Sequence, residues 1–201
     1  MRVALFGGTF DPIHRGHLAI AGAAADAFAL DRVLFAPVGQ QPLKSESAAA
    51  SFADRLEMTR LACVADPRFA VSTVDAPRVD GSPNYTVDTL AALACEMPSA
   101  TLFVLTGADS FLDLRRWRSP ERLLELAEWI VVSRPDFPLS DPQLAALALT
   151  ASQRARVHLL PTVQEEVSAT DLRLRLRAAD PCPGLLPAAV AEYIQSRALY
   201  R

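Results

Sequence analysis

The first 28 residues constrain the fold more than any other stretch of the chain. Arg2–Phe6 is a short apolar run that predicts a buried strand, which Gly7 and Gly8 are expected to end. His14 and His17 follow, and an Ala-rich helix is predicted to begin at His17. A strand that leads through glycines into a helix brings unpaired N–H groups and imidazoles to one place. Because the helix dipole also favours anions there, we expect an anion site after the first strand.

Beyond this opening, strands and helices alternate. Further strands are expected at Arg32–Pro37, Ala70–Asp75, Thr101–Thr106, Trp129–Ser133 and Val157–Leu160. Helices are expected at His17–Phe28, Phe52–Ala65, Thr86–Cys95, Pro120–Leu126, Pro142–Leu149, Ser168–Ala178 and Pro187–Arg197. Apolar runs without strict alternation favour strands buried on both faces. The pattern predicts an α/β fold, a Rossmann-like doubly wound parallel sheet with a small C-terminal helical cap, and ligands at the carboxyl ends of the strands.

Composition and charge narrow the class of protein. The 201 residues are 51% hydrophobic and 21% charged with a net charge of −3, which predicts one globular domain over residues 1–201, helical from about residue 168. Without a basic excess, no nucleic-acid partner is indicated. No apolar run reaches membrane-spanning length, so we expect no membrane contact and a cytoplasmic protein. Cys63, Cys95 and Cys182 form no C-x-x-C motif and are interpreted as reduced thiols.

The glycine–histidine stretch allows several interpretations. It lacks the G-x-G-x-x-G pattern of a dinucleotide site, and the chain contains no G-x-x-x-x-G-K-S/T phosphate loop. A nucleotidyl-transfer site, with His14 and His17 touching the phosphates of a nucleoside triphosphate, fits the glycines, which let phosphate approach the backbone. A surface turn with two incidental histidines and a helical H-x-x-H metal pair remain as alternatives.

Residues 7–17, GGTFDPIHRGH, resemble the signature of the HxGH nucleotidyltransferase superfamily. In its full form, G-G-T-F-D-P-x-H-x-G-H, the motif is similar to that of the bacterial nicotinate-nucleotide adenylyltransferases. The resemblance implies catalytic roles for His14 and His17 and contacts to ATP from Gly7, Gly8, Thr9 and Phe10.

Two later motifs support the same family. Residues 106–110, TGADS, match its G-x-D-S element, so Gly107 and Asp109 would bind ATP, the carboxylate through ribose; the alternative is a helix N-cap. Residues 167–173, VSATDLR, resemble its I-S-S/T-T-x-I/L-R motif. The resemblance implies that Ser168, Thr170 and Arg173 hold the triphosphate opposite the histidines, with Arg173 catalytic. Ser168 and Asp171 also form a capping pattern at a helix start.

The expected acceptor site lies between these motifs. Residues 84–90, NYTVDTL, resemble the family element S-Y-T-x-x-T-L, in which a helix starting at Thr86 would offer N–H groups to the carboxylate of nicotinate. The resemblance also implies binding of nicotinate mononucleotide by Tyr85, by Trp117 stacked on the pyridine ring, and by Arg134 at the phosphate. An ordinary tryptophan and a solvated arginine are the alternatives.

One loop departs from the family pattern. Where the family has P-P-H-K/R, residues 41–44 are Gln-Pro-Leu-Lys, within a loop expected over Gly39–Ser51. Lys44 is retained as an expected ATP contact, whereas Leu43 stands in place of a histidine.

The implied reaction transfers AMP from ATP to nicotinate mononucleotide, giving nicotinate adenine dinucleotide and pyrophosphate in NAD synthesis. It needs in-line positioning and charge neutralisation rather than a covalent intermediate. Mg²⁺ is expected with ATP, without a metal site made by the protein alone. The alternatives are another acceptor, nicotinamide mononucleotide or phosphopantetheine, and a nucleotide-binding protein without catalysis. The sequence gives no oligomeric state.

Overall fold

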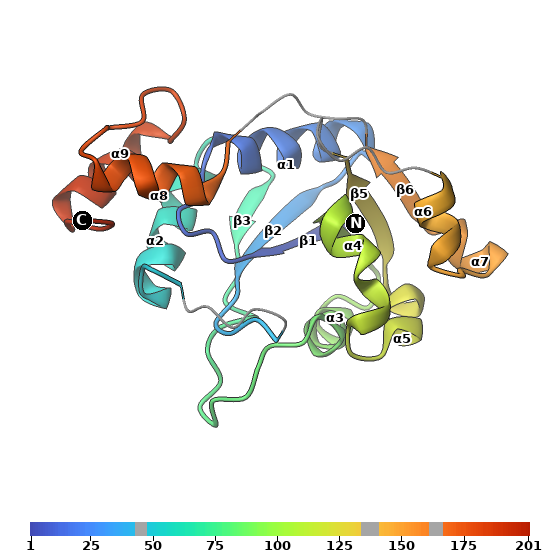
Figure 1. Ribbon diagram of the computed structural model, residues 1–201. Coiled ribbons are helices and arrows are strands. Elements are labelled where there is room, and N and C mark those ends of the chain that lie inside the picture. Colours follow the sequence, from blue (N-terminus) through green and yellow to red (C-terminus); the bar gives the residue numbers. More distant parts are fainter. Residues whose placement is uncertain (43–47, 134–140, 161–166) are drawn as a thin grey trace.

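The computed structural model describes residues 1–42, 48–133, 141–160 and 167–201. Within these ranges, six parallel strands form one sheet in the order β3-β2-β1-β4-β5-β6 (Figure 1). The strands are β1 (Arg2–Gly8), β2 (Arg32–Pro37), β3 (Phe69–Val71), β4 (Thr101–Gly107), β5 (Glu128–Val132) and β6 (Val157–Leu160).

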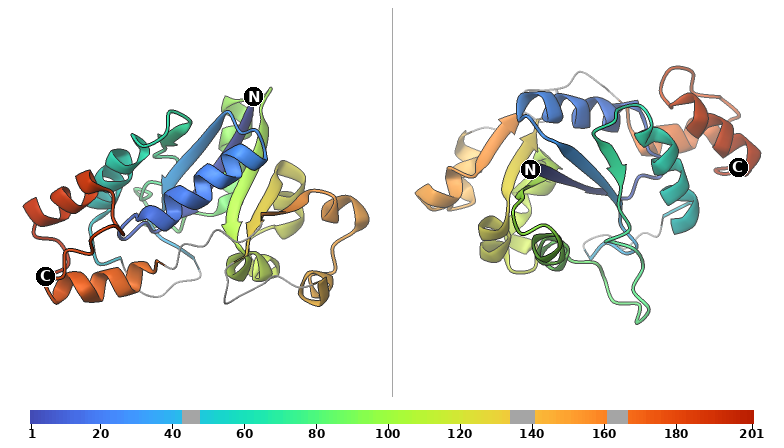
Figure 2. Two further views of the ribbon diagram at one scale, coloured as in Figure 1. Left: turned by 90° about the horizontal axis from the view of Figure 1, so that it is seen from above. Right: turned by 180° about the vertical axis from the view of Figure 1, so that it is seen from behind.

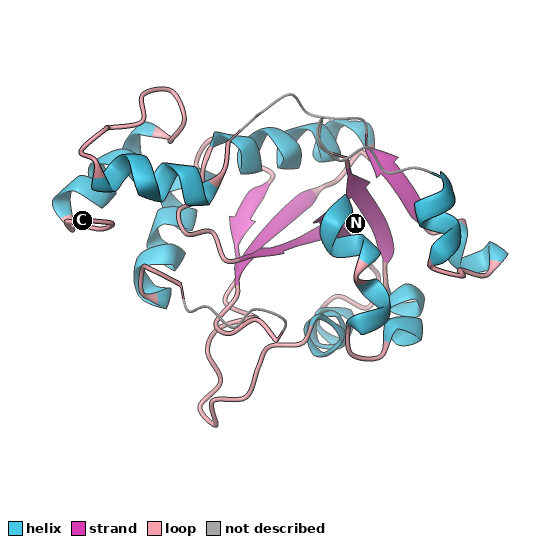
Figure 3. Ribbon diagram, in the orientation of Figure 1, coloured by secondary structure: helices cyan, strands magenta, loops and turns pink. Residues whose placement is uncertain are grey.

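Helices connect the strands and cover both faces of the sheet (Figure 3). They are α1 (Arg15–Ala27), α2 (Phe52–Cys63), α3 (Thr86–Glu96), α4 (Ala108–Leu112), the 3-10 helix η1 (Leu114–Arg116), α5 (Pro120–Leu126), α6 (Asp141–Ala146), α7 (Ala151–Arg154), α8 (Ala169–Arg177) and α9 (Ala188–Ser196). None of the helices in the described ranges combines the length and the apolar character that crossing a membrane requires.

The core lies in two layers because successive residues of a strand point to opposite faces. In β1, Ala4 and Phe6 face the layer under α1, α2, α8 and α9, whereas Val3 and Leu5 face the layer under α3 and α5. Both faces are buried, which explains the continuous apolar run of the first strand. The doubly wound parallel fold expected from the sequence is therefore confirmed.

The expected helical cap is also present. Helices α8 and α9 lie beside α2, on the face of the sheet that α1 covers (Figure 2). Leu172 of α8 and Val190 and Ile194 of α9 are buried in the core layer of that face. The cap thus packs next to the segment that joins β1 to α1.

The site is positioned by the switch in strand order. The first strand pairs with β2 on one side and β4 on the other, while the chain after β1 turns away through α1 toward β2. The chain after β1 therefore leaves toward the face covered by α1, and the chain after β4 leaves through α4 toward the opposite face, so a crevice forms between these connections. Ligands of open parallel sheets bind in such a crevice.

Several element boundaries differ from those expected. Gly7 and Gly8 belong to β1 instead of ending it, because both pair with β2 and Val38 N donates to Gly8 O (2.9 Å). β3 ends at Val71, and the expected strand over Ala70–Asp75 is wrong beyond that point. There the chain turns, with Ala76 N bonded to Thr73 O (2.9 Å). The short helices α4 and α7 were not expected, and α6 ends before Leu149.

Candidate active site

His14 and His17 lie together at the start of α1. His14 is the N-cap, and its backbone N donates to Nδ1 of His17, the third helical residue (3.3 Å). The two rings stack with centroids 3.7 Å apart and planes inclined by 29°. In this first turn Arg15 N donates to Leu185 O (3.0 Å) and His17 N to His14 O (3.0 Å). The two imidazoles therefore stand at the positive end of the helix dipole, which favours a bound anion.

The His17 ring also packs against an aromatic cluster of Phe6, Phe10 and Phe35. It makes edge-to-face contacts with Phe6 (6.0 Å between ring centroids) and Phe10 (5.0 Å), and both phenylalanines pack on Phe35. Phe10 has a left-handed φ of 49°. Its side chain is buried and therefore belongs to the core rather than to a ligand-binding surface. A Cβ at Gly8 would lie 3.0 Å from this ring, so glycine lets the strand end pack on it.

Arg173 connects α8 to the histidine loop, by which we mean residues 9–14. Its Nη1 donates to the carbonyl of Asp11 (2.7 Å) and its Nη2 to Oγ1 of Thr170 (3.2 Å). Ser168 is the N-cap of α8, which confirms the helix start expected there, but its hydroxyl accepts no capping hydrogen bond in the described structure. Both Ser168 and Thr170 are exposed, which leaves their hydroxyls at the surface beside the loop.

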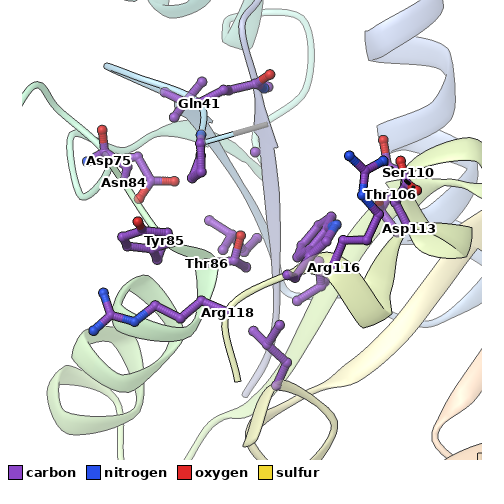
Figure 4. A pocket seen from close by; sticks show the side chains of 18 of the residues that line it. Gln41, Asp75, Asn84, Tyr85, Thr86, Thr106, Ser110, Asp113, Arg116 and Arg118 are labelled. Atoms are coloured by element: carbon purple, nitrogen blue, oxygen red, sulfur yellow. Dashed lines mark hydrogen bonds and ion pairs between the residues drawn. The ribbon is translucent and has the colours of Figure 1, made fainter. Parts of the chain in front are cut away.

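A pocket of about 400 Å³ opens between the ends of β1 and β4 (Figure 4). Asp75, Asn84 and Tyr85 lie along one side, and Thr106, Ser110, Asp113 and Arg116 along the other. Six of the residues expected at the site line it: Gly7, Gly8, Tyr85, Thr86, Asp109 and Trp117. Both β1 glycines, two residues of the G-x-D-S motif and three of the expected acceptor residues therefore meet in one pocket. The histidine loop begins directly after Gly8 and does not itself line the pocket.

Gly107 and Asp109 form one unit at the end of β4. Gly107 is the N-cap of α4, so the alternative in which Asp109 or Ser110 caps a helix is wrong. A Cβ at Gly107 would lie 2.6 Å from Oδ1 of Asp109, whereas glycine leaves that place to the carboxylate. Asp109 is exposed and lines the pocket, where its oxygens are available to accept hydrogen bonds.

The acceptor side combines a helix start with aromatic rings. Helix α3 begins at Thr86 as expected, with Tyr85 as its N-cap. Trp117 is half-buried and meets Trp129 edge-on, with ring centroids 5.8 Å apart. The guanidinium of Arg118 lies 4.6 Å from the centre of the Tyr85 ring, a cation–π contact that places a positive charge at the pocket.

Sequence reasoning missed four charged side chains that line this pocket: Asp75, Asp113, Arg116 and Arg118. Arg118 directly follows Trp117, which the sequence analysis had assigned to the acceptor site. Its position beside that tryptophan was the signal that could have identified it. Asp75 was expected inside a strand, yet it is buried at the pocket wall and accepts a hydrogen bond from Oγ1 of Thr89. Burial raises the pKa of the Asp75 carboxyl, while the Thr89 hydroxyl and the charge of Arg78 partly oppose the rise.

Some expected residues lie outside the described ranges. These are Leu43 and Lys44 in the loop after β2, and Arg134 after β5. In the part of the chain that the structure describes, no three His, Cys, Asp or Glu side chains are grouped to hold a metal ion. At the start of α1, the two imidazoles and the positive end of the helix dipole suit phosphate oxygens.

Fold and site together define the class. A doubly wound parallel sheet, with a histidine loop at its switch point and an adjoining polar and aromatic pocket, is typical of an α/β protein that binds a nucleotide beside a second small molecule.

Comparisons with known proteins give the family. The cytidylyltransferase-like family model matches residues 5–175. A "Probable nicotinate-nucleotide adenylyltransferase" of Streptomyces coelicolor is 43% identical over 195 residues, covering 97% of this chain and 98% of the relative. One of the same description from Mycolicibacterium vanbaalenii is 40% identical over 200 residues, covering 100% and 92%. The chain therefore belongs to the cytidylyltransferase-like family and, within it, to the nicotinate-nucleotide adenylyltransferases.

Solved structures agree on the fold. The Plasmodium falciparum nicotinic acid mononucleotide adenylyltransferase complexed with NaAD superposes with a TM-score of 0.79 at 16% identity, covering 99% of this chain and 97% of that one. A putative nicotinate-nucleotide adenylyltransferase from Vibrio parahaemolyticus gives 0.67 at 18% identity, covering 100% and 95%.

Proposed function

We propose that the protein transfers AMP from ATP to nicotinate mononucleotide, forming nicotinate adenine dinucleotide and releasing pyrophosphate. The observation that carries the proposal is the meeting of two sites at the switch point of the sheet. The histidine loop supplies phosphate-binding groups, and the pocket beside it offers a helix start and a tryptophan. In this proposal the whole chain acts as one nucleotidyltransferase domain in the cytoplasm, where ATP is available.

The chemistry is a single displacement at phosphorus. A 5′-phosphate oxygen of the mononucleotide forms a bond to the α-phosphorus of ATP, and the bond from that phosphorus to the pyrophosphate oxygen breaks. The attacking phosphate is already anionic at neutral pH, so no general base is required. His14, His17 and Arg173 position the phosphates and neutralise the charge that develops on the α-phosphoryl and leaving groups.

Other contacts to ATP follow from the position of each residue. Gly7, Gly8, Thr9 and the backbone of Phe10 border the phosphates, and Asp109 accepts hydrogen bonds from ribose hydroxyls. Ser168 and Thr170 offer their exposed hydroxyls to the triphosphate. Lys44 is proposed as a further phosphate contact. Mg²⁺ accompanies ATP and neutralises phosphate charge, held by the nucleotide itself.

Acceptor binding uses the opposite side of the pocket. The N–H groups at the start of α3, next to Tyr85 and Thr86, bind the carboxylate of nicotinate. Trp117 stacks on the pyridine ring, and Arg134 binds the phosphate of the mononucleotide. Arg118 adds a positive charge near the nicotinate carboxylate. Nicotinamide has a neutral amide in place of that carboxylate, so the charge favours nicotinate.

Replacing Trp117 by alanine should raise the KM for nicotinate mononucleotide about tenfold, the loss expected for one aromatic stack. The KM for ATP should stay within about twofold, because the histidine loop is unchanged. Initial rates measured with each substrate varied in turn test this split, and Trp117→Phe, which keeps a ring, should recover most of the loss. Equal rises in both KM values would contradict stacking on the pyridine ring.

Pyrophosphate release tests the function itself. ATP and Mg²⁺ are supplied with nicotinate mononucleotide, nicotinamide mononucleotide or phosphopantetheine in separate reactions. We expect a preference for the first acceptor of about tenfold or more, equivalent to about 1.4 kcal/mol of discrimination. Faster turnover with another acceptor would overturn the assignment of the pocket. Binding of ATP without turnover of any acceptor would instead indicate a nucleotide-binding protein without catalysis.

A further inference from the structure

A buried carboxylate lies inside the histidine loop. The side chain of Asp11 is 4% exposed, three residues before His14. In the described structure its Oδ2 accepts from the backbone N of Ala49 (2.6 Å), and its Oδ1 accepts from the N of Ala50 (3.1 Å) and the hydroxyl of Tyr200 (2.6 Å). A buried charge is costly unless donors satisfy it, so these distant segments are drawn to the loop.

The same loop is held from α2 by a buried arginine. Arg55 is 2% exposed, and its Nη1 donates to the carbonyl of Thr9 (2.7 Å). Burial lowers the pKa of the Arg55 guanidinium, and the negative charge of Asp11 opposes that change. The loop therefore carries a buried negative charge at Asp11 and is bonded to a buried positive charge, Arg55, from α2.

Tyr200 reaches Asp11 from the segment that follows α9. It is buried, with a left-handed φ of 62°, a conformation that residues other than glycine adopt only when the surroundings enforce it. Burial and the neighbouring Asp11 carboxylate raise the pKa of the Tyr200 hydroxyl far above its usual value. The hydroxyl is therefore protonated at neutral pH and donates to Asp11.

Residues 9–11 are thus bonded to the chain just before α2 through the N–H groups of residues 49 and 50, to α2 through Arg55, to α8 through Arg173, and to the segment after α9 through Tyr200. The loop leads directly into the N-cap of α1. We propose that Tyr200, acting through the Asp11 carboxylate, is a positioning residue that holds His14 and His17 in place for the phosphates. This inference rests on the proposed nucleotidyl transfer.

The chain contains a matched control for this bond. Tyr193, on α9, donates its hydroxyl to Oδ1 of Asp54 (2.9 Å) at the start of α2. Both bonds join a tyrosine of this region to an aspartate, but the Tyr193 bond docks α9 on α2 and does not touch the histidine loop. A role for Tyr200 in stability alone predicts that folded protein keeps its kcat when either hydroxyl is removed, whereas positioning predicts a loss of kcat for Tyr200 only.

The test compares Tyr200→Phe with Tyr193→Phe, each lacking one hydroxyl. Tyr200→Phe should lower the free energy of unfolding more than Tyr193→Phe, because the Tyr200 bond is buried and the Tyr193 bond only partly so; kcat is therefore compared at a temperature where both variants are folded. We expect Tyr200→Phe to lower kcat about tenfold, less than the roughly hundredfold that a 1 Å misplacement can cause. Tyr193→Phe should stay within about twofold, and neither variant should change the KM for nicotinate mononucleotide by more than about twofold, because the acceptor pocket is unaltered. Equal kcat values for the two folded variants would overturn the inference.

Two further measurements complete the test. Asp11→Asn should reduce kcat by a similar factor, and the double variant Asp11→Asn/Tyr200→Phe should lose no more than Asp11→Asn alone, since the two residues act as one unit. Additive losses would contradict the coupling. Binding of Mg²⁺-ATP without acceptor should weaken severalfold in Tyr200→Phe and not in Tyr193→Phe. The ATP-binding measurement does not depend on the acceptor, so it tests the inference even if the wild-type protein proves inactive with nicotinate mononucleotide. An unchanged ATP affinity in Tyr200→Phe would contradict the inference.

Discussion

His17→Ala should lower kcat by about two to three orders of magnitude, the loss that follows removal of one preorganised donor to a transition state. The ring is fixed before any substrate arrives, because it stacks on His14 and meets the edges of Phe6 and Phe10. A group held in this way needs no reorganisation as charge develops on the phosphates. The measurement is pyrophosphate release at saturating ATP and nicotinate mononucleotide.

The remaining histidine of the chain provides the control. His158 lies on β6 and its Nε2 bonds to Glu128 (2.6 Å), outside the pocket and the histidine loop. His158→Ala should therefore keep kcat within about twofold, the range usual for distant, independent sites. His17→Ala also removes the acceptor of the His14 backbone N–H, so the thermal unfolding of both variants must be compared. A loss below about fivefold in folded His17→Ala protein would remove His17 from the transition-state contacts.

The sheet could be predicted from the sequence because its signal is local. Uninterrupted apolar runs separated by helical segments leave few arrangements other than a parallel sheet covered on both faces. The start of α3 at Thr86 and the strand at Arg32–Pro37 were predicted to the residue. Strand boundaries were wrong where hydrogen bonds to a neighbouring strand determine how far a strand extends. Gly7 and Gly8 were expected to end the first strand because they are glycines, but both pair with β2.

Orientation of side chains within a motif could not be predicted. The order of residues in GGTFDP does not show that Phe10 turns into the core while the backbone around it stays near the site. That choice depends on Phe6, Phe35 and His17, which the fold brings against the ring. Phe10 was expected as an ATP contact; its side chain is buried, so the contact stays a prediction for its backbone.

The hydrogen bonds that hold the histidine loop were also beyond reach of a sequence pattern. Asp11 is separated from Tyr200 by 189 positions, and the Arg173 side chain from its acceptor carbonyl by 162. The sequence motifs placed the loop and the start of α8 in one site through the family resemblance. Only the packing of α8 and α9 beside α2 shows how the loop is held.

Arg173→Ala should lower kcat/KM for ATP by about two to three orders of magnitude, because one side chain supplies both a phosphate-binding charge and a hold on the histidine loop. Its Nη1 binds the Asp11 carbonyl and its Nη2 the Thr170 hydroxyl, so the guanidinium is oriented by two groups of the proposed triphosphate site. Arg173→Lys keeps the charge but loses the planar fork, and should recover only part of the loss, remaining about tenfold or more below wild type.

Arg177 separates this role from a general effect of positive charge. It lies one turn further along α8 and is exposed. Arg177→Ala removes the same charge from the same helix and should change kcat/KM for ATP by less than about threefold, since an exposed charge is screened by solvent and salt. Initial rates at low ATP concentration, measured at two ionic strengths, make the comparison. Similar losses in Arg173→Ala and Arg177→Ala, both relieved by salt, would mean that α8 attracts ATP without a specific contact from Arg173. A loss confined to Arg173 and independent of salt would mean that the oriented guanidinium takes part in the reaction.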